Sequence, residues 1–139
     1  MMLLDTNVIS EPLRWEPEPR VIEWIDAQPL ETVFLSAITV AELRAGVALL
    51  PAGKRQAGLQ ENLEKRVLPL FAGRVLSFDL ACTRAYAESI ARARKAGFAI
   101  AASDGYIAAI AATNGLSVAT RDTNPFEAAG IAVVNPWSS

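Results

Sequence analysis

The sequence predicts an α/β fold in which helices cover both faces of a mainly parallel sheet. Short apolar runs typical of buried strands recur along the 139 residues, separated by helical stretches of ten or more residues. Parallel strands need crossovers of that length, and right-handed crossovers place helices on both faces. With 52% apolar residues the chain can bury one core. We therefore predict a three-layer, single-domain protein spanning residues 1–139.

The first half is expected to hold two strands and the helices that follow them. A proline-rich stretch precedes one helix and Pro29 closes it, because proline cannot continue a helix. The Ser36 hydroxyl can cap the helix after it. In order, the expected elements are a strand ending at Asp5, a short helix or turn over residues 8–13, a helix over 19–27, a strand over 32–35 and a helix over 37–48.

The second half continues the alternation of strand and helix. Asp79 is expected to cap a long helix that Gly97 stops. The other elements are a helix over residues 53–70 with Leu59, Leu63, Val67 and Leu70 turned inward, a strand over 73–78, a helix over 106–113 introduced by Ser103-Asp104-Gly105, and strands over 116–120 and 131–134.

Composition excludes several kinds of chemistry. The chain has no histidine, which removes histidine-based nucleophile pairs, general bases and zinc sites. Its single cysteine, Cys82, stands among apolar residues and cannot form an internal disulfide, which fits a reducing cytoplasm. A net charge of −2 provides no general attraction to polyphosphate. No run is long enough to span a membrane, so we expect a cytoplasmic protein that does not contact one.

Four of the fifteen acidic residues lie in or next to apolar stretches rather than in polar segments: Asp5, Glu42, Asp104 and Asp122. Asp5 and Asp122 end apolar runs, and the carboxyl edge of a parallel sheet is where ligands bind. Glu42 is expected to lie close to the core on a helix. Two carboxylates about 5 Å apart repel by roughly 3 kcal/mol, so such a cluster needs a cation. Mg²⁺, or Mn²⁺ in its place, suits these oxygen ligands.

A structural interpretation competes with the metal site. Asp5, Asp104 and Asp122 each precede a plausible helix, where aspartate commonly serves as an N-cap. The combination of strand-end aspartates, a helical glutamate and no histidine favours the metal site. That pattern is consistent with a nuclease, a phosphatase or a metal-binding regulator.

Four motifs in order along the chain resemble the PIN-domain family, most strongly its VapC-type and FitB-like toxins. The motifs are Leu3-Leu4-Asp5-Thr6-Asn7, Ser36 to Gly46, Ser103-Asp104-Gly105-Tyr106 and Ala119-Thr120-Arg121-Asp122-Thr123. The chain departs from the pattern at Asp122, where many relatives carry Asn and a later acidic residue near the place of Pro125. The segment before Asp104 is also more apolar than usual.

The resemblance implies a Mg²⁺- or Mn²⁺-dependent endoribonuclease that acts as the toxin of a toxin-antitoxin pair. Its partners would be RNA as substrate, a cognate antitoxin, a second copy in a homodimer, and operator DNA only through the antitoxin. Asp5, Glu42, Asp104 and Asp122 match the family's acidic quartet, at once metal ligands and catalytic residues. Thr6 and Asn7 lie beside the first aspartate.

Cations and apolar surfaces add further candidates. Arg121 is the best candidate for a substrate phosphate, whereas Arg14 and Arg44 fit solvated surface charge, Arg44 because it points away from Glu42. The helices over 19–27 and 53–70, with Trp15, are candidate partner surfaces. Two alternative functions remain. One is an antitoxin-binding module of a DNA-bound complex with little nuclease activity. The other, ranked last, is a dehalogenase-like phosphatase, whose second aspartate is replaced here by Asn7.

Overall fold

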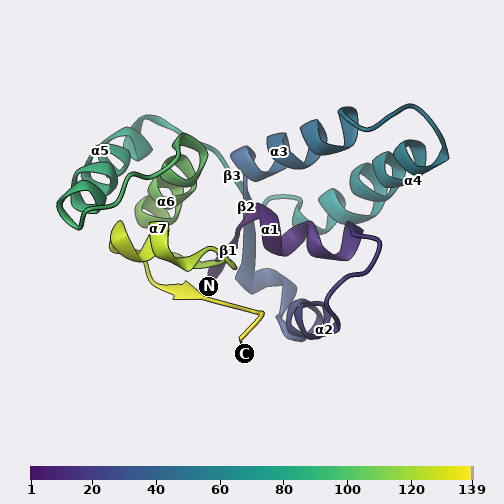
Figure 1. The fold of residues 1–139 in the computed structure, drawn as a ribbon, viewed down its shortest axis with the longest axis horizontal. Helices are drawn as coiled ribbons and strands as arrows, with labels where there is room; N and C mark the ends of the chain where they lie inside the picture. Colours follow the sequence, from purple (N-terminus) through teal and green to yellow (C-terminus); the bar gives the residue numbers. More distant parts are fainter. Residues whose placement is uncertain (139) are drawn as a thin grey trace.

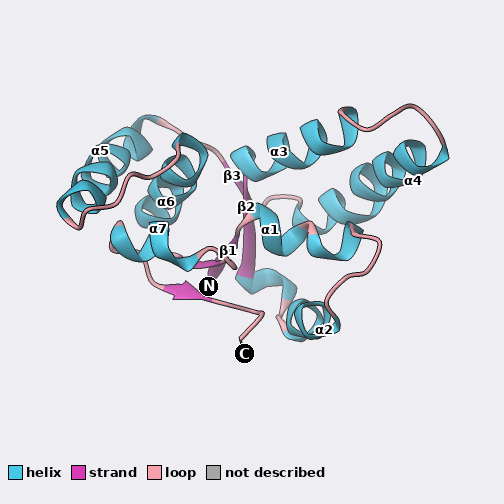
Figure 2. Cartoon of the chain, viewed as in Figure 1, coloured by secondary structure: helices cyan, strands magenta, loops and turns pink. Residues whose placement is uncertain are grey.

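Five parallel strands form one sheet at the centre of the computed structural model, which describes residues 1–138 (Figures 1 and 2). The strand order is β3-β2-β1-β4-β5, and each neighbouring pair is parallel. The strands are β1 (Met2–Leu4), β2 (Val33–Ser36), β3 (Val75–Leu76), β4 (Ser117–Ala119) and β5 (Val133–Val134). The predicted α/β fold class is confirmed.

Helices lie on both sides of this sheet, as the three-layer prediction requires. Figure 1 shows α5 (Leu80–Lys95), α6 (Ala102–Asn114) and α7 (Thr123–Ala128) on one side of the strands. On the other side lie α1 (Thr6–Ile9), α2 (Pro19–Ala27), α3 (Ala37–Ala48) and α4 (Lys54–Asn62). Within residues 1–138, no helix is both long and apolar enough to cross a membrane.

Each face of the sheet has its own apolar core, because successive side chains of a strand point to opposite faces. Leu3 packs with Ile107, Ile110 and Phe126 on the side of α6 and α7. Its neighbour Leu4 belongs to the other cluster, on the side of α1 and α3. Burial on both faces explains why the strands read as continuous apolar runs.

The strand order creates a topological switch point between β1 and β4. From β1 the chain builds outward through β2 to β3, crosses back through α5 and α6, and then builds the opposite half from β4 to β5. Crevices at the carboxyl ends of such neighbouring strands are where open α/β sheets bind ligands. Asp5 follows β1, and Asp122 lies just beyond the end of β4.

The predicted helix over residues 53–70 is wrong in its second half. The chain leaves α4 at Asn62, widens into a π-helical turn over Leu63–Val67 and ends in a 3-10 turn over Leu68–Phe71. Pro69 has no N–H to continue an α-helix. The changed register buries Phe71 and leaves Leu70 51% exposed, contrary to the expected inward position of Leu70.

Three other boundaries differ from prediction. The expected strand over 73–78 is paired only at Val75 and Leu76, because its partner strand β2 ends at Ser36, where α3 begins. Helix α6 begins at Ala102 rather than after Gly105, so Asp104 lies inside its first turn. Helix α7 was expected only as a plausible helix after Asp122, without bounds. Pro125 is tolerated there because the first N–H groups of a helix have no internal acceptor.

The predicted helix caps at Ser36 and Asp79 are confirmed. The Ser36 hydroxyl accepts a hydrogen bond from the Thr39 N–H at 2.9 Å, and the Asp79 carboxylate accepts one from the Cys82 N–H at 3.2 Å. Ser36 is fully buried and joins β2 directly to α3.

Replacing Ser36 by Ala is expected to destabilise the protein by about 1 kcal/mol, because the first turn of α3 loses its capping acceptor. Urea unfolding of the purified variant would measure the change. An unfolding midpoint equal to that of the wild-type protein would contradict it.

Candidate functional site

Asp5 is a buried carboxylate at the end of β1, with only 5% of its surface exposed. One of its oxygens accepts the Thr6 backbone N–H at 2.8 Å, so Asp5 also caps α1. The other oxygen accepts the Thr120 hydroxyl at 2.8 Å and the Asn7 amide at 3.4 Å. Asp5 therefore serves as a helix cap and also holds β4 close to β1.

The pKa of Asp5 is raised from 3.8 to about 6, chiefly by burial and also by the nearby charges of Asp104 and Glu42. Its hydrogen bonds from Thr120 and Thr6 act in the opposite direction, but they do not cancel the cost of burying the charge. Ionised Asp5 therefore destabilises the metal-free fold, and a bound cation would offset that cost.

Glu42 lies on α3 and is exposed, which corrects the expectation that it would approach the core. Leu43 and Val47 face the core instead. The two carboxylate oxygens of Glu42 accept the hydroxyls of Thr6 at 2.7 Å and Ser103 at 3.4 Å. Glu42 is thus satisfied by hydroxyl groups at the rim and needs no buried partner.

Asp104 and Asp122 approach the same edge from α6 and from the loop after β4. Asp104 is half-buried, and burial together with the charges of Asp122 and Glu42 raises its pKa. Asp122 occupies the N-cap position of α7, but its side chain makes no capping hydrogen bond. Capping therefore does not explain Asp122, and its carboxylate remains exposed at the rim.

Hydrogen bonds connect all four sequence motifs. Glu42 links the first and third motifs through Thr6 and Ser103. Asn7 reaches the fourth, since its amide donates to Thr120 at 3.3 Å and its oxygen accepts the Arg121 backbone N–H at 3.2 Å. Segments far apart in sequence are thereby held at one edge of the sheet.

The three candidate arginines differ in their surroundings. Arg14 pairs with Glu11 at 3.2 Å, and Arg44 pairs with Glu64 at 2.8 Å, so both have structural partners. The Arg121 guanidinium lies 5.2 Å from the centre of the Trp137 ring and forms none of the salt bridges within residues 1–138. Arg121 directly precedes Asp122 in sequence and remains the candidate for a phosphate contact.

The donor set fits a hard divalent cation. None of the ion pairs within residues 1–138 involves the four carboxylates, so no lysine or arginine neutralises them. In the same part of the chain, no three acidic or cysteine side chains lie close enough together to coordinate one metal ion. Mutual repulsion keeps uncompensated carboxylates apart, and a cation would draw them together.

The family model of the PIN domain matches residues 2–131 of this chain. The chain belongs to the PIN-domain family. Among curated relatives, "Plasmid stability protein StbB" of Pseudomonas syringae pv. tomato is 66% identical over 139 residues, with all of both chains covered. "VapC ribonuclease Y4jK" of Sinorhizobium fredii is 58% identical and "Toxin FitB" of Neisseria gonorrhoeae 59% identical, each over 137 residues. Those alignments cover 99% of this chain and 98% and 99% of the relatives.

A solved structure agrees with this assignment. The fold matches "Structure of FitAB bound to IR36 DNA fragment" with a TM-score of 0.96 and 57% identity, covering 99% of this chain and 96% of that one. The recognition of the PIN family from four short motifs is confirmed.

Three supporting residues of this PIN domain were not singled out from the sequence: Thr39, Ser103 and Thr120. Each is a hydroxyl residue that contacts a predicted site residue. Thr120 carried a usable signal, because it is a polar residue at the end of an apolar strand, directly before Arg121 and Asp122. A small hydroxyl residue at the end of an apolar strand, close to a carboxylate, therefore indicates a supporting position in a site of this kind.

Replacing Thr120 by Val is expected to lower metal affinity and any metal-dependent activity about 10- to 100-fold, as for other residues that orient ligands. The Thr120 hydroxyl donates to Asp5 and accepts the Asp122 N–H at 3.0 Å. Its loss should raise the pKa of Asp5 further. Manganese titration would measure the effect. Thr120→Ser keeps the hydroxyl and should behave like the wild-type protein; equal losses in both variants would contradict this role.

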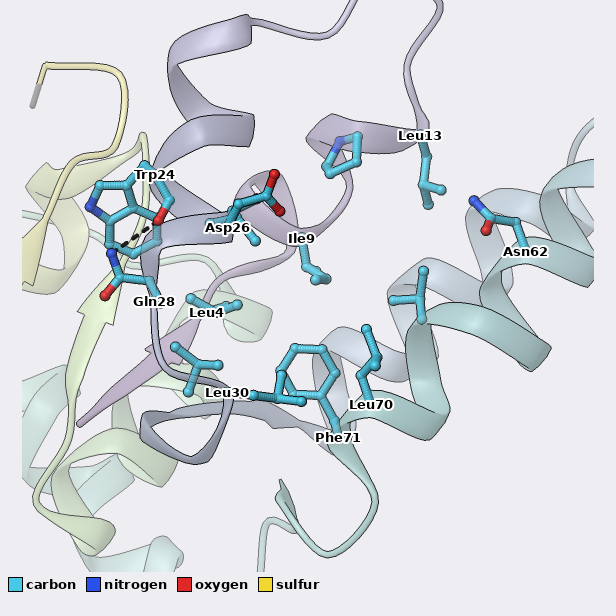
Figure 3. Close-up of a pocket in the computed structure, with 14 residues that line it drawn as sticks. Leu4, Ile9, Leu13, Trp24, Asp26, Gln28, Leu30, Asn62, Leu70 and Phe71 are labelled. Atoms are coloured by element: carbon cyan, nitrogen blue, oxygen red, sulfur yellow. Dashed lines mark hydrogen bonds between the residues drawn. The ribbon is translucent and has the colours of Figure 1, made fainter.

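An apolar pocket of about 300 Å³ lies on the side of the sheet that carries α1 and α2 (Figure 3). Figure 3 shows Leu13, Leu70 and Phe71 facing Ile9 and Trp24 across it. None of the four carboxylates lines it. The chain thus carries an acidic edge suited to a cation and a separate apolar pocket suited to side chains of a partner.

Proposed function

We propose that this chain is the toxin of a toxin-antitoxin pair and a Mg²⁺- or Mn²⁺-dependent endoribonuclease. The observation that carries the proposal is a set of four carboxylates without cationic partners at the topological switch point. The chain's 58% identity to a VapC ribonuclease supports RNA as the substrate.

Asp5, Glu42 and Asp104 would hold the metal ion, with Asp5 the most strongly buried of them. When bound, the ion lowers the pKa of a water molecule and offsets charge on the phosphodiester. Asp122, free of a capping bond, orients the water that attacks phosphorus. Thr6 and Thr120 hold Glu42 and Asp5 in position. Arg121 contacts the substrate phosphate.

Incubation of the purified chain with mixed RNA in Mg²⁺, Mn²⁺ or EDTA tests this function. We expect cleavage in either metal, none in EDTA, and none by Asp104→Asn. Glu127→Gln is the matched control, because Glu127 is an exposed carboxylate on α7, away from the edge. Cleavage that persists in EDTA would contradict a metal-dependent nuclease.

The partner in this proposal is a small antitoxin that inserts a basic, apolar segment into the pocket of Figure 3. Residues 11–31, which supply much of the pocket wall, contain six acidic and two basic residues. That local excess of negative charge favours a basic segment. Operator DNA would be reached only through the antitoxin, as the name of the matching FitAB complex suggests.

Replacing Leu70 by Arg is expected to weaken antitoxin binding about 10- to 100-fold, because it removes an apolar contact and repels a basic segment. RNA cleavage by the free variant should be unchanged. Leu80→Arg is the matched control, since Leu80 is an exposed leucine on the opposite helical layer, at 86% exposure. Calorimetric titration with the co-purified antitoxin measures the affinity of each variant for it. Equal affinities for the two variants would place the antitoxin elsewhere.

The second function considered from the sequence is that of an antitoxin-binding module with little nuclease activity, and one variant distinguishes it from the nuclease. If the chain is such a module, Asp5→Asn would leave toxicity in cells unchanged. Toxicity lost in Asp5→Asn, with antitoxin binding retained, would exclude the module and support the nuclease.

A further inference from the structure

Three aromatic side chains form a rigid cluster against the first turn of α6. Tyr106 lies three residues after Ser103, which contacts Glu42, and residues three apart share a face of a helix. The rings of Tyr86 and Tyr106 stack with centres 5.0 Å apart and planes 27° from parallel. Phe78 meets both edge-on, at 6.2 Å from Tyr86 and 5.1 Å from Tyr106. Such packing holds ring planes in fixed orientations.

Gly105 sets the distance between this cluster and the carboxylate edge. A Cβ atom at Gly105 would lie 2.9 Å from the Tyr86 ring, so only glycine lets the ring rest directly on the first turn of α6. Gly105 follows Asp104 in that turn. The cluster is therefore built against the same turn that carries a candidate metal ligand.

The aromatic cluster is only partly buried. Phe78 and Tyr86 pack against the core, whereas Tyr106 is not among the side chains that do so. All three rings are partly exposed. Within residues 1–138, the hydroxyls of Tyr86 and Tyr106 form no hydrogen bond with the protein. Neither hydroxyl is a buried polar atom without a partner. Both phenol groups thus face water.

An RNA-binding surface is needed because charge alone gives this chain little affinity for RNA. The net charge is −2, and the candidate site itself carries four carboxylates. Unpaired bases stack on aromatic rings with favourable energies that do not depend on phosphate contacts. Partly exposed rings next to the reacting phosphate would provide that affinity.

We propose that Tyr106, supported by Tyr86 and Phe78, is a stacking subsite for an unpaired nucleobase next to the cleaved phosphodiester. The subsite rests on the proposed ribonuclease function and adds to it a preference for single-stranded RNA. Purines should bind more tightly than pyrimidines, because a larger ring system covers more of the tyrosine face.

The test compares Tyr106→Leu with Tyr106→Phe, which keeps the ring. Fluorescein-labelled single-stranded A12, U12 and a 12-mer of abasic ribose-phosphates serve as probes in Mg²⁺. The variants are made in the full chain carrying Asp5→Asn, so that the probes stay intact. Trp15→Leu, which removes an exposed aromatic ring in the loop before α2, is the control.

We expect Tyr106→Leu to bind A12 roughly tenfold more weakly than the parent, with Tyr106→Phe and Trp15→Leu unchanged. The abasic 12-mer should bind all variants equally. Equal A12 affinity in Tyr106→Leu and its parent would overturn the subsite, as would a change in oligomeric state by light scattering, which would make this face a subunit contact. Failure of the wild-type chain to cleave mixed RNA would instead overturn the ribonuclease function.

Discussion

Replacing Asp5 by Asn is expected to lower RNA cleavage by more than about a hundredfold. Residues that only orient metal ligands contribute about 10- to 100-fold, and a ligand itself should contribute more. Asp5 is the most buried of the four carboxylates and contacts Thr120 across the switch point. An amide at this position can still accept the Thr6 N–H, so the fold should survive. Cleavage of mixed RNA in Mn²⁺ measures the loss.

The same variant should be more stable than the wild-type protein at pH 8 without metal. The pKa of Asp5 is raised from 3.8 to about 6, and each unit corresponds to about 1.4 kcal/mol, so its ionisation costs the fold up to about 3 kcal/mol. A carboxylate with a raised pKa contributes stability below its unfolded pKa, and that contribution is lost as pH rises through the folded value. The stability of Asp5→Asn relative to the wild-type protein should therefore increase as the pH rises from 4 to 6.

Urea unfolding at pH 4 and pH 8, in EDTA, tests the sign of this effect. Asp5→Asn should match or fall below the wild-type stability at pH 4 and exceed it at pH 8. Glu127→Gln, an exposed substitution of the same chemistry, should show no such pH dependence. A variant less stable than the wild-type protein at both pH values would mean that the hydrogen bonds of Asp5 outweigh the cost of its burial.

The fold class could be predicted because strand and helix patterns are local properties of the sequence. Continuous apolar runs such as Leu3-Leu4 indicated strands buried on both faces, and Ser36 and Asp79 marked helix starts through their capping side chains. The edge that gathers Asp5 and Asp122 followed from parallel topology alone.

What sequence did not provide depends on contacts between distant segments. Neighbouring apolar residues suggested a buried Glu42, but Thr6 and Ser103 hold it at the exposed rim. The π-helical turn after α4 shifted Leu70 outward by a change of register that the spacing of apolar residues did not indicate, although Pro69 marked the end of the α-helix. The tyrosine cluster depends on the approach of Tyr86 to Gly105 across two helices, which periodicity cannot show.

Binding of Mn²⁺ is expected to weaken by about tenfold or more between pH 7 and pH 5 and to release protons near pH 6. A carboxylate must lose its proton to bind a metal. The pKa of Asp5 is about 6, and that of Asp104 is also raised, by burial and by Asp122 and Glu42. Asp5 must release a proton to bind Mn²⁺, so below its pKa each unit of falling pH lowers the affinity for Mn²⁺ about tenfold.

Calorimetric titration with Mn²⁺ in two buffers of different ionisation enthalpy counts the released protons. In Asp5→Asn, the number of protons released on Mn²⁺ binding should fall to those that Asp104 releases, and the affinity for Mn²⁺ should depend less on pH. Equal affinity at pH 5 and pH 7, with no proton release, would separate metal binding from Asp5. The burial that destabilises the metal-free protein is thus the same property that makes its affinity for a cation depend on pH, because both reflect the cost of one buried negative charge.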